Sequence, residues 1–374
     1  VENLFDAEHD VENGEDKEDF TFTPKGTPGK AEYCESLTVP AYKKECEVDW
    51  NEGRVNEKIK QIVKAIKSAD KTLPDILGLV EVENEAVVKR LAKSLGYDED
   101  NVFVTQSPDK RGIDVAVIFK ESDTLKFGGG NQSGIEGMEV PTRNILEVEF
   151  KLYGKYSLFV YKELWPKQRP PASIRIKVAN EFQKRIASRL KSENNHVILM
   201  GDFNVVDSDY PHPFHEVTLN RNADIRLYDV QESFWKSWDI PSAQKYALPL
   251  GTYYYKPKMS WNLLDRFFVS ENMEPGYKKE CQEGLFVDVK TYNINNNSTV
   301  SANYEYKQKD WPNSSLVGNK VVGIPSAYEV IKTGGKLGYS DHFSIQVELN
   351  NTTNKANAKD CEGLKKYPSR PRKA

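Results

Sequence analysis

The sequence predicts an α/β fold in which two mixed β-sheets pack face to face and helices cover their outer faces. Apolar runs of strand length outnumber the helical patterns, and several follow one another with no helix between them. That order argues against a doubly wound parallel sheet, in which strands alternate with helices. The 374 residues contain no repeat and no linker, so we expect one domain over 1–350 and a basic tail over 351–374.

Three helices are predicted from apolar residues at helical spacing. They lie after residue 53, within 85–96 and within 174–191, and the second ends at a glycine. The strands are predicted from short apolar runs, namely 73–83, 112–119, 144–150, 156–161, 196–203, 263–270 and 343–349. Residues 1–53 are polar and acidic, and we expect an irregular segment there. Its stretch 6–19 could bind Ca²⁺, but it lacks the spacing of a Ca²⁺ loop.

The composition is that of an ordinary soluble protein, with 38% hydrophobic residues, 29% charged residues and a net charge of −4. No run approaches the roughly 18 apolar residues of a membrane span, so none is expected. Mild acidity does not indicate a nucleic-acid binder, although a site for divalent cations can itself recruit phosphate. The chain opens without Met, so we expect an upstream segment, including any targeting signal, to be missing from this sequence.

The four cysteines favour two disulfides and an oxidising compartment, outside the cell or in a periplasm. Cys34 and Cys46 bracket a short polar loop, whereas Cys281 and Cys361 are far apart in sequence. We therefore prefer the pairs Cys34–Cys46 and Cys281–Cys361, although four cysteines allow three pairings. No Cys-x-x-Cys spacing or Cys/His cluster indicates zinc.

Polar side chains recur where buried apolar runs end. The run Val197–Met200 stops at Gly201, and Asp202 and Asn204 follow it two residues apart, so their side chains point the same way. Other runs carry further polar residues at their ends, namely Glu81, Asp265, Asp341 and His342. Each could be a structural residue with a partner. Together they are harder to explain structurally, because buried charge is costly unless it is paired or bound to metal.

Such a set of side chains matches the needs of phosphodiester hydrolysis. Mg²⁺ prefers carboxylate oxygens and keeps several waters, and a metal held in this way neutralises a phosphoryl oxygen and the departing alkoxide. A carboxylate can orient or deprotonate the attacking water, an amide can donate to the developing charge, and a cationic histidine backed by a carboxylate can bind a non-bridging oxygen.

On these motifs the sequence resembles the endonuclease/exonuclease/phosphatase superfamily, and most closely its secreted bacterial nuclease branch. Seven motifs occur in the family's order: "VENLFD" (1–6), "PDILGLVEVEN" (74–84), "RGIDVAVIF" (111–119), "TRNILEVEF" (142–150), "ILMGDFN" (198–204), "GTYYYKPKMSWNLLDRFFVS" (251–270) and "YSDHF" (339–343). The resemblance implies a four-layer α/β/β/α sandwich. It also implies that Glu81 is the principal ligand of Mg²⁺, with Mn²⁺ or Ca²⁺ as alternatives, and that Asp341 assists.

The resemblance further assigns the catalytic roles. Asp202 would orient the attacking water and Asn204 would stabilise the transition state. Asp265 would hold His342, which would contact the scissile phosphate. We expect a monomer that acts on nucleic acid, mainly DNA. Basic side chains that could hold the phosphate backbone are Lys110, Arg111, Arg143, Lys167 and Arg169.

The chain departs from the family pattern in two places. The first motif lacks its leading Asn, whose place Asn3 does not take. The branch usually reads V-N-H-W-P-S where this chain has "VYKELWPK", so Leu164 stands where a phosphate-contacting His is usual. Lys162, two residues earlier on the same strand face, could supply the missing charge. Losing one such donor typically costs about 100- to 1000-fold in rate.

Three functions are therefore open. The first is a secreted metal-dependent nuclease of low sequence specificity, which cuts DNA and can extend to RNA; the forms "VENLFD", "RGIDVAVIF" and "WNLLD" favour it. The second is a phosphodiesterase or phosphatase acting on a lipid or a small molecule. The third is a weakened or inactive family member that binds nucleic acid without turnover. The retention of six costly polar strand ends argues against the third.

Overall fold

The computed structural model describes residues 1–12, 15–70, 72–135, 137–138, 142–167, 170–220, 225–274, 284–331 and 337–352. Its largest sheet has six strands in the order β10-β13-β9-β8-β7-β6. These strands are β6 (Leu125–Ser133), β7 (Ile145–Leu152), β8 (Tyr156–Leu164), β9 (Asn195–Asp202), β10 (Leu227–Asp229) and β13 (Asp265–Ser270). The β8–β9 pair is parallel and the other pairs are antiparallel. The predicted α/β fold with a mixed sheet is confirmed.

A second sheet contains β3 (Ile76–Val82), β5 (Asp114–Phe119) and β4 (Val102–Val104) in that order. It differs from the expected mixed sheet, because β3 and β4 both pair antiparallel to β5. A single parallel bridge joins Leu4 to Val82 at its edge. The N-terminal segment therefore runs beside the end of β3.

Four two-stranded pairs and seven helices complete the described elements. The further strands are β1 (Val11–Glu12), β2 (Glu15–Asp16), β11 (Tyr253–Tyr255), β12 (Ser260–Asn262), β14 (Gly284–Ile294), β15 (Ser301–Glu305), β16 (Lys320–Pro325) and β17 (Ile345–Thr352). The helices are α1 (Lys30–Ser36), α2 (Pro40–Cys46), α3 (Glu52–Ala69), α4 (Glu85–Leu95), α5 (Ala172–Arg189), α6 (Val230–Lys236) and α7 (Ser242–Tyr246). Single helical turns lie at Phe20–Phe22, Phe214–Thr218, Lys256–Lys258 and Glu271–Met273.

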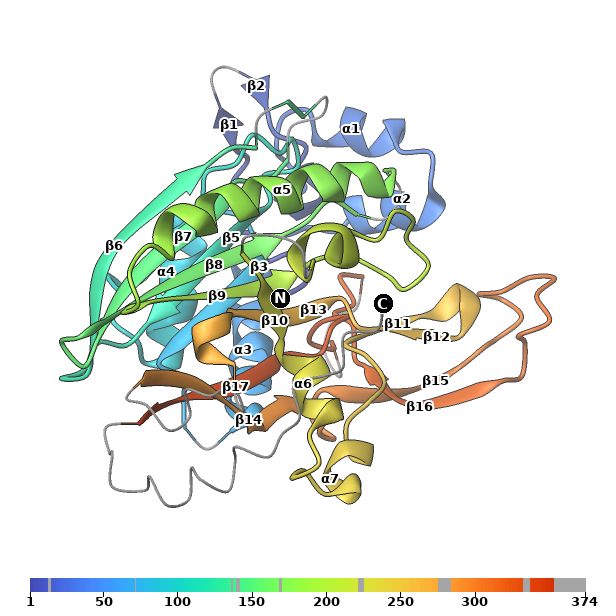
Figure 1. Ribbon diagram of the computed structural model, residues 1–374. Helices are drawn as coiled ribbons and strands as arrows, with labels where there is room; N and C mark the ends of the chain where they lie inside the picture. Colours follow the sequence, from blue (N-terminus) through green and yellow to red (C-terminus); the bar gives the residue numbers. More distant parts are fainter. Residues whose placement is uncertain are drawn as a thin grey trace.

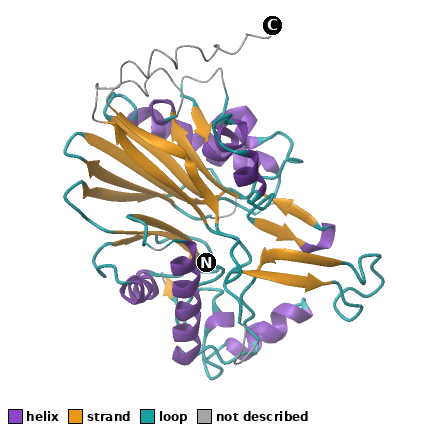
Figure 2. Ribbon diagram, turned by 90° about the horizontal axis from the view of Figure 1, so that it is seen from below, coloured by secondary structure: helices purple, strands orange, loops and turns teal. Residues whose placement is uncertain are grey.

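Side chains alternate between the two faces of each strand, so the buried residues form three separate cores. Val117 of β5 and Val160 of β8 meet between the two sheets, whereas Ala116 packs against α3 and α4 and Tyr161 packs against α5. Strands β5, β8 and β9 are buried along nearly their whole length because both of their faces are covered. The layers are therefore helix, sheet, sheet and helix, and Figures 1 and 2 show the strands between the helices.

The apolar stripes predicted for α3 and α5 face these cores. Ile59 and Ile62 of α3 and Phe182 and Ile186 of α5 are buried, and α4 ends at Gly96 in a left-handed conformation. No helix within the described residues is long and apolar enough to span a bilayer.

The segment 1–53 is less irregular than expected. Residues 30–36 and 40–46 form α1 and α2, whose periodicity is too short to detect in the sequence. The predicted Cys34–Cys46 disulfide is confirmed and joins these two helices, with their Cα atoms 5.5 Å apart. Cys281, Cys361 and the tail from residue 353 onward lie outside the described residues.

The close approach of β9 to β8 just before the polar strand end depends on Gly201, which pairs in register with Glu163. A Cβ atom at this position would lie 2.1 Å from the carbonyl oxygen of Glu163 on β8, so any larger residue must push the two parallel strands apart. We expect Gly201→Ala to lower the free energy of unfolding by about 1–3 kcal/mol, measured by urea denaturation. Gly26→Ala is the matched control, because nothing lies within 4 Å of its Cβ position. Equal effects of the two substitutions would contradict this explanation.

Candidate active site

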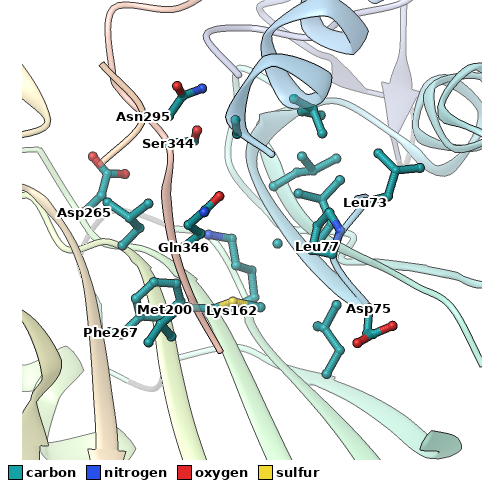
Figure 3. Close-up of a pocket in the computed structure, with 18 of the residues that line it drawn as sticks. Leu73, Asp75, Leu77, Lys162, Met200, Asp265, Phe267, Asn295, Ser344 and Gln346 are labelled. Atoms are coloured by element: carbon teal, nitrogen blue, oxygen red, sulfur yellow. The ribbon is translucent and has the colours of Figure 1, made fainter. Parts of the chain in front are cut away.

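The polar strand ends converge on one cavity. Asp202 ends β9 and Asp265 begins β13, and the antiparallel register places these two residues directly opposite each other. Glu81 comes from β3 in the other sheet, and Asp341 and His342 come from the loop before β17. All five line a cavity of about 620 Å³ that extends between the sheets. Figure 3 shows part of its lining.

Asp265 and His342 form an ion pair in the lining of this cavity. The Nδ1 atom of His342 lies 2.7 Å from Oδ2 of Asp265. Burial lowers the pKa of His342, but Asp265, Asp341 and Asp202 outweigh burial and raise the pKa well above its ordinary value. Burial raises the pKa of Asp265, yet His342 and a hydrogen bond from Thr252 lower it on balance. The pair is therefore ionised at neutral pH, with a cationic imidazole facing the cavity.

Thr252 and Tyr253 hold this pair in place. The Thr252 hydroxyl, which is fully buried, accepts hydrogen bonds from the backbone of Leu264 and Asp265. The Thr252 carbonyl accepts a bond of 2.8 Å from the amide of Phe343, and the Tyr253 ring lies 4.9 Å from the His342 ring. Sequence reasoning missed the role of Thr252, although it lies within the quoted motif 251–270.

Asp202 is held by Asn204. One carboxylate oxygen accepts from the Asn204 backbone amide at 2.8 Å, and the other accepts from its side-chain amide at 3.1 Å. The same side-chain nitrogen donates to the Trp165 carbonyl at 3.0 Å, so both of its hydrogens are engaged. Burial raises the pKa of Asp202 to about 6. Asp202 is therefore a carboxylate at neutral pH with a raised affinity for a proton, as a base requires.

Glu81 lies at a bulge in β3, where the register with β5 shifts between Val80 and Val82. Its φ of 58° is uncommon for a residue other than glycine, and strained backbone of this kind clusters at functional sites. Burial raises the pKa of Glu81, but Lys167 and other nearby cations outweigh burial and lower it. Glu81 is therefore an anion in a half-buried position.

The spacing of these carboxylates suits an ion that keeps several waters, such as Mg²⁺, better than an ion that is enclosed by protein ligands. Within the described ranges, no three of these strand-end side chains bring their ligand atoms within 4.8 Å of one another. Mg²⁺ is usually bound by one or two carboxylates and keeps several waters, whereas structural Zn²⁺ needs four close ligands. Glu81 and Asp341 are the strand-end carboxylates predicted to hold it.

Basic side chains gather beside Glu81. Arg143 is buried, and two of its nitrogens, Nε and Nη2, have no hydrogen-bond partner, although Nε lies 3.5 Å from Asp109. Arg111 and Lys167 are more exposed, and both lower the pKa of Glu81. Of the other predicted basic residues, Lys110 is exposed and Arg169 lies outside the described part of the chain.

Leu164 and Lys162 both face the space between the sheets. Leu164 is buried in the core there and pairs in register with Asp202, so it offers no hydrogen bond at this strand end. Lys162 lines the cavity, and Figure 3 shows its side chain between Gln346 and Leu77. Burial lowers the pKa of Lys162 to about 8, against the effect of Asp265 and Asp202. A cation therefore lies near these two carboxylates.

A second lysine near the site was not predicted. Lys58 is fully buried on α3, and its Nζ atom has no hydrogen-bond partner but lies 3.8 Å above the centre of the Tyr328 ring. Burial lowers its pKa to about 8, while Glu2, Asp341 and Glu81 oppose this shift. Lys58 lies within the apolar stripe of α3, and this position, which is visible in the sequence, could have indicated that the lysine is buried.

Comparison with known proteins identifies the family and the fold. The sequence matches the model of the Endonuclease/Exonuclease/phosphatase family over residues 1–351. A search of curated proteins finds no match. Solved structures that are similar include D. rerio TDP2 humanized by 14 mutations, at 14% identity and a TM-score of 0.50, covering 80% of this chain and 94% of that chain. A mannosyl-6-phosphatase of Bacteroides thetaiotaomicron VPI-5482 has 16% identity and a TM-score of 0.46, covering 79% and 91%.

Thr252 should affect turnover through the position of Asp265. We expect Thr252→Val to lower kcat about tenfold, because removal of the hydroxyl leaves Asp265 without one partner. Thr252→Ser should restore most of the activity, since it keeps the hydroxyl. Both are measured by steady-state hydrolysis of a phosphodiester. A serine variant as impaired as the valine variant would show that packing, not the hydrogen bond, matters here.

Replacement of Lys162 should lower the activity without lowering the stability of the fold. Lys162→Met keeps the length of the side chain and removes the buried charge, so we expect activity to fall about 100-fold while the thermal midpoint stays equal or rises. Differential scanning calorimetry and the same hydrolysis assay check the two parts. Full activity in this variant would exclude Lys162 as the replacement for the missing donor at Leu164.

Proposed function

We propose that this chain, which belongs to the endonuclease/exonuclease/phosphatase family, is a divalent-metal-dependent phosphodiesterase that cuts nucleic acid, mainly DNA. The observation that carries the proposal is the Asp265–His342 ion pair, which shares one cavity with Asp202 and Glu81. This set contains a base, a cationic donor and an anionic metal ligand, which are the groups that phosphodiester hydrolysis requires.

Glu81 and Asp341 would hold the metal, for which Mg²⁺ is proposed and Mn²⁺ is a suitable substitute. When bound, the ion supplies positive charge to the phosphoryl oxygen and to the departing oxygen. Glu81 is suited to this task because it is anionic and half-buried. The waters that such an ion keeps would occupy the space left between the carboxylates.

Asp202 would position the attacking water and accept its proton. Its raised pKa of about 6 makes it a stronger base than an exposed carboxylate, while it stays ionised at neutral pH. Asn204 holds both of its oxygens. For Asn204 to donate to the transition state as well, it must give up its bond to the Trp165 carbonyl or to Asp202.

His342 would donate a hydrogen bond to a non-bridging oxygen of the scissile phosphate. Asp265 engages Nδ1, which leaves Nε2 to face the substrate, and keeps the ring cationic. The Nε and Nη2 atoms of Arg143, which have no hydrogen-bond partner, are a second set of donors for the phosphate, and Arg111 and Lys167 extend the basic surface. Such a surface suits a polyanion better than a single phosphate group.

A secreted or periplasmic location forms part of the proposal. The Cys34–Cys46 disulfide supports it, because structural disulfides persist in oxidising compartments and are rare in the cytosol.

Plasmid nicking tests the proposed activity. We expect supercoiled DNA to be nicked with Mg²⁺ or Mn²⁺ and to stay intact with EDTA. Glu81→Gln should lower the rate at least about 100-fold, because it removes the charge of the proposed metal ligand. Glu18→Gln, which removes an exposed carboxylate elsewhere, is the control and should leave the rate unchanged.

Small substrates separate the alternatives. Hydrolysis of p-nitrophenyl phosphate without nicking of DNA would contradict the nuclease proposal and favour a phosphatase. A folded protein that binds DNA and hydrolyses neither substrate would instead indicate that Leu164 has cost the chain its activity. Leu164→His would then be expected to restore part of it.

A further inference from the structure

A second group of carboxylates lies where the N-terminal segment meets the end of β3. Asp10, Asp19 and Glu83 each place one carboxylate oxygen within 4.8 Å of the other two. Asp19 and Glu83 are almost fully buried, at 1% and 3% exposed. Among the residues that the structure describes, this is the one group of three such side chains that lies so close together. None of its members belongs to the candidate active site.

The Glu83 carboxylate lacks a partner for one of its oxygens. Oε2 accepts from the Asp6 amide at 2.7 Å, whereas Oε1 is buried and has no hydrogen-bond partner. Asp19 uses both oxygens, one with Nδ1 of His9 at 2.5 Å and one with the Asp10 amide at 2.8 Å. A buried carboxylate oxygen beside two other carboxylates is costly unless a cation compensates it.

We propose that Asp10, Asp19 and Glu83 bind a Ca²⁺ ion. Ca²⁺ binds oxygen ligands at about 2.3–2.6 Å, so two ligands on opposite sides of the ion lie about 4.6–5.2 Å apart. The three carboxylate oxygens lie within 4.8 Å of one another, so all three can contact one such ion. Mg²⁺ fits less well, because it needs near-ideal octahedral geometry and usually takes only one or two carboxylates. The spacing of a Ca²⁺ loop is absent because the ligands come from two distant segments.

The ion would fasten the N-terminal segment to β3 beside the catalytic ligand Glu81. The Leu4 amide donates to the Glu81 carbonyl at 2.8 Å, and the Glu83 amide donates to the Leu4 carbonyl at 3.0 Å. Trp50 donates to the Asp6 carbonyl at 2.8 Å from the other side. The cation is therefore structural, and its proposed effect is on stability and on the order of the strand that carries Glu81.

Calcium binding to the whole chain, stripped with EDTA, tests the proposal. We expect millimolar CaCl₂ to raise the thermal midpoint by about 4 °C or more, and MgCl₂ to raise it by less than half as much. Isothermal titration with CaCl₂ should show one site that Glu83→Gln and Asp10→Asn each weaken at least tenfold. Glu81→Gln and Glu18→Gln are matched controls and should keep this site.

Three results would overturn the proposal. If CaCl₂ gives neither heat nor a thermal shift with the wild-type protein, no ion binds, and a proton on Glu83 neutralises this group of carboxylates instead. If Glu81→Gln abolishes the thermal shift while Glu83→Gln and Asp10→Asn keep it, Ca²⁺ binds at the candidate active site. If Glu83→Gln fails to fold, the Asp10→Asn variant decides between the outcomes, because Asp10 is only half-buried and its replacement should not prevent folding. Unchanged Ca²⁺ affinity in Asp10→Asn contradicts the proposed site.

Discussion

Four carboxylates from strand ends lie in the lining of one cavity, and their mutual repulsion is the constraint on which the rest of the site depends. Like charges this close cannot all stay ionised in a buried place unless cations face them. His342 faces Asp265 at 2.7 Å, and Lys162 lies near both Asp265 and Asp202. Basic residues play the same part beside Glu81. The site is therefore an electrostatic balance to which a bound divalent cation would add two further positive charges.

The two sheets must pack face to face for this balance to exist, and the backbone is adapted locally to allow it. Glu81 and Asn204 both adopt positive φ angles, of 58° and 49°, at the points where their strands end. Gly78 and Gly201 lie where a Cβ atom would be crowded: one at Gly78 would lie 2.7 Å from the Lys162 side chain, and one at Gly201 would lie 2.1 Å from the Glu163 carbonyl oxygen. The functional side chains are thus placed by backbone geometry that would be costly elsewhere.

Much of this could be predicted from the sequence, because buried strands are visible as apolar runs and the polar residues that end them are visible as interruptions. The Asp265–His342 pair followed from the resemblance, as did the presence of Leu164 where a polar residue is usual. Thr252 could not be predicted, since its hydroxyl acts through backbone contacts that depend on how the β11–β12 hairpin packs. The cluster of three carboxylates around Glu83 could not be predicted either, because its members come from segments that only the fold brings together.

Anomalous diffraction from crystals soaked in Mn²⁺ would test the central claim most directly, namely that the strand-end carboxylates form a metal site for phosphodiester hydrolysis. A peak within ligand distance of the Glu81 carboxylate, with waters completing its coordination, is the predicted result. A well-ordered Glu81 with no peak beside it, in crystals of protein that hydrolyses phosphodiesters in solution with Mn²⁺, would contradict the claim.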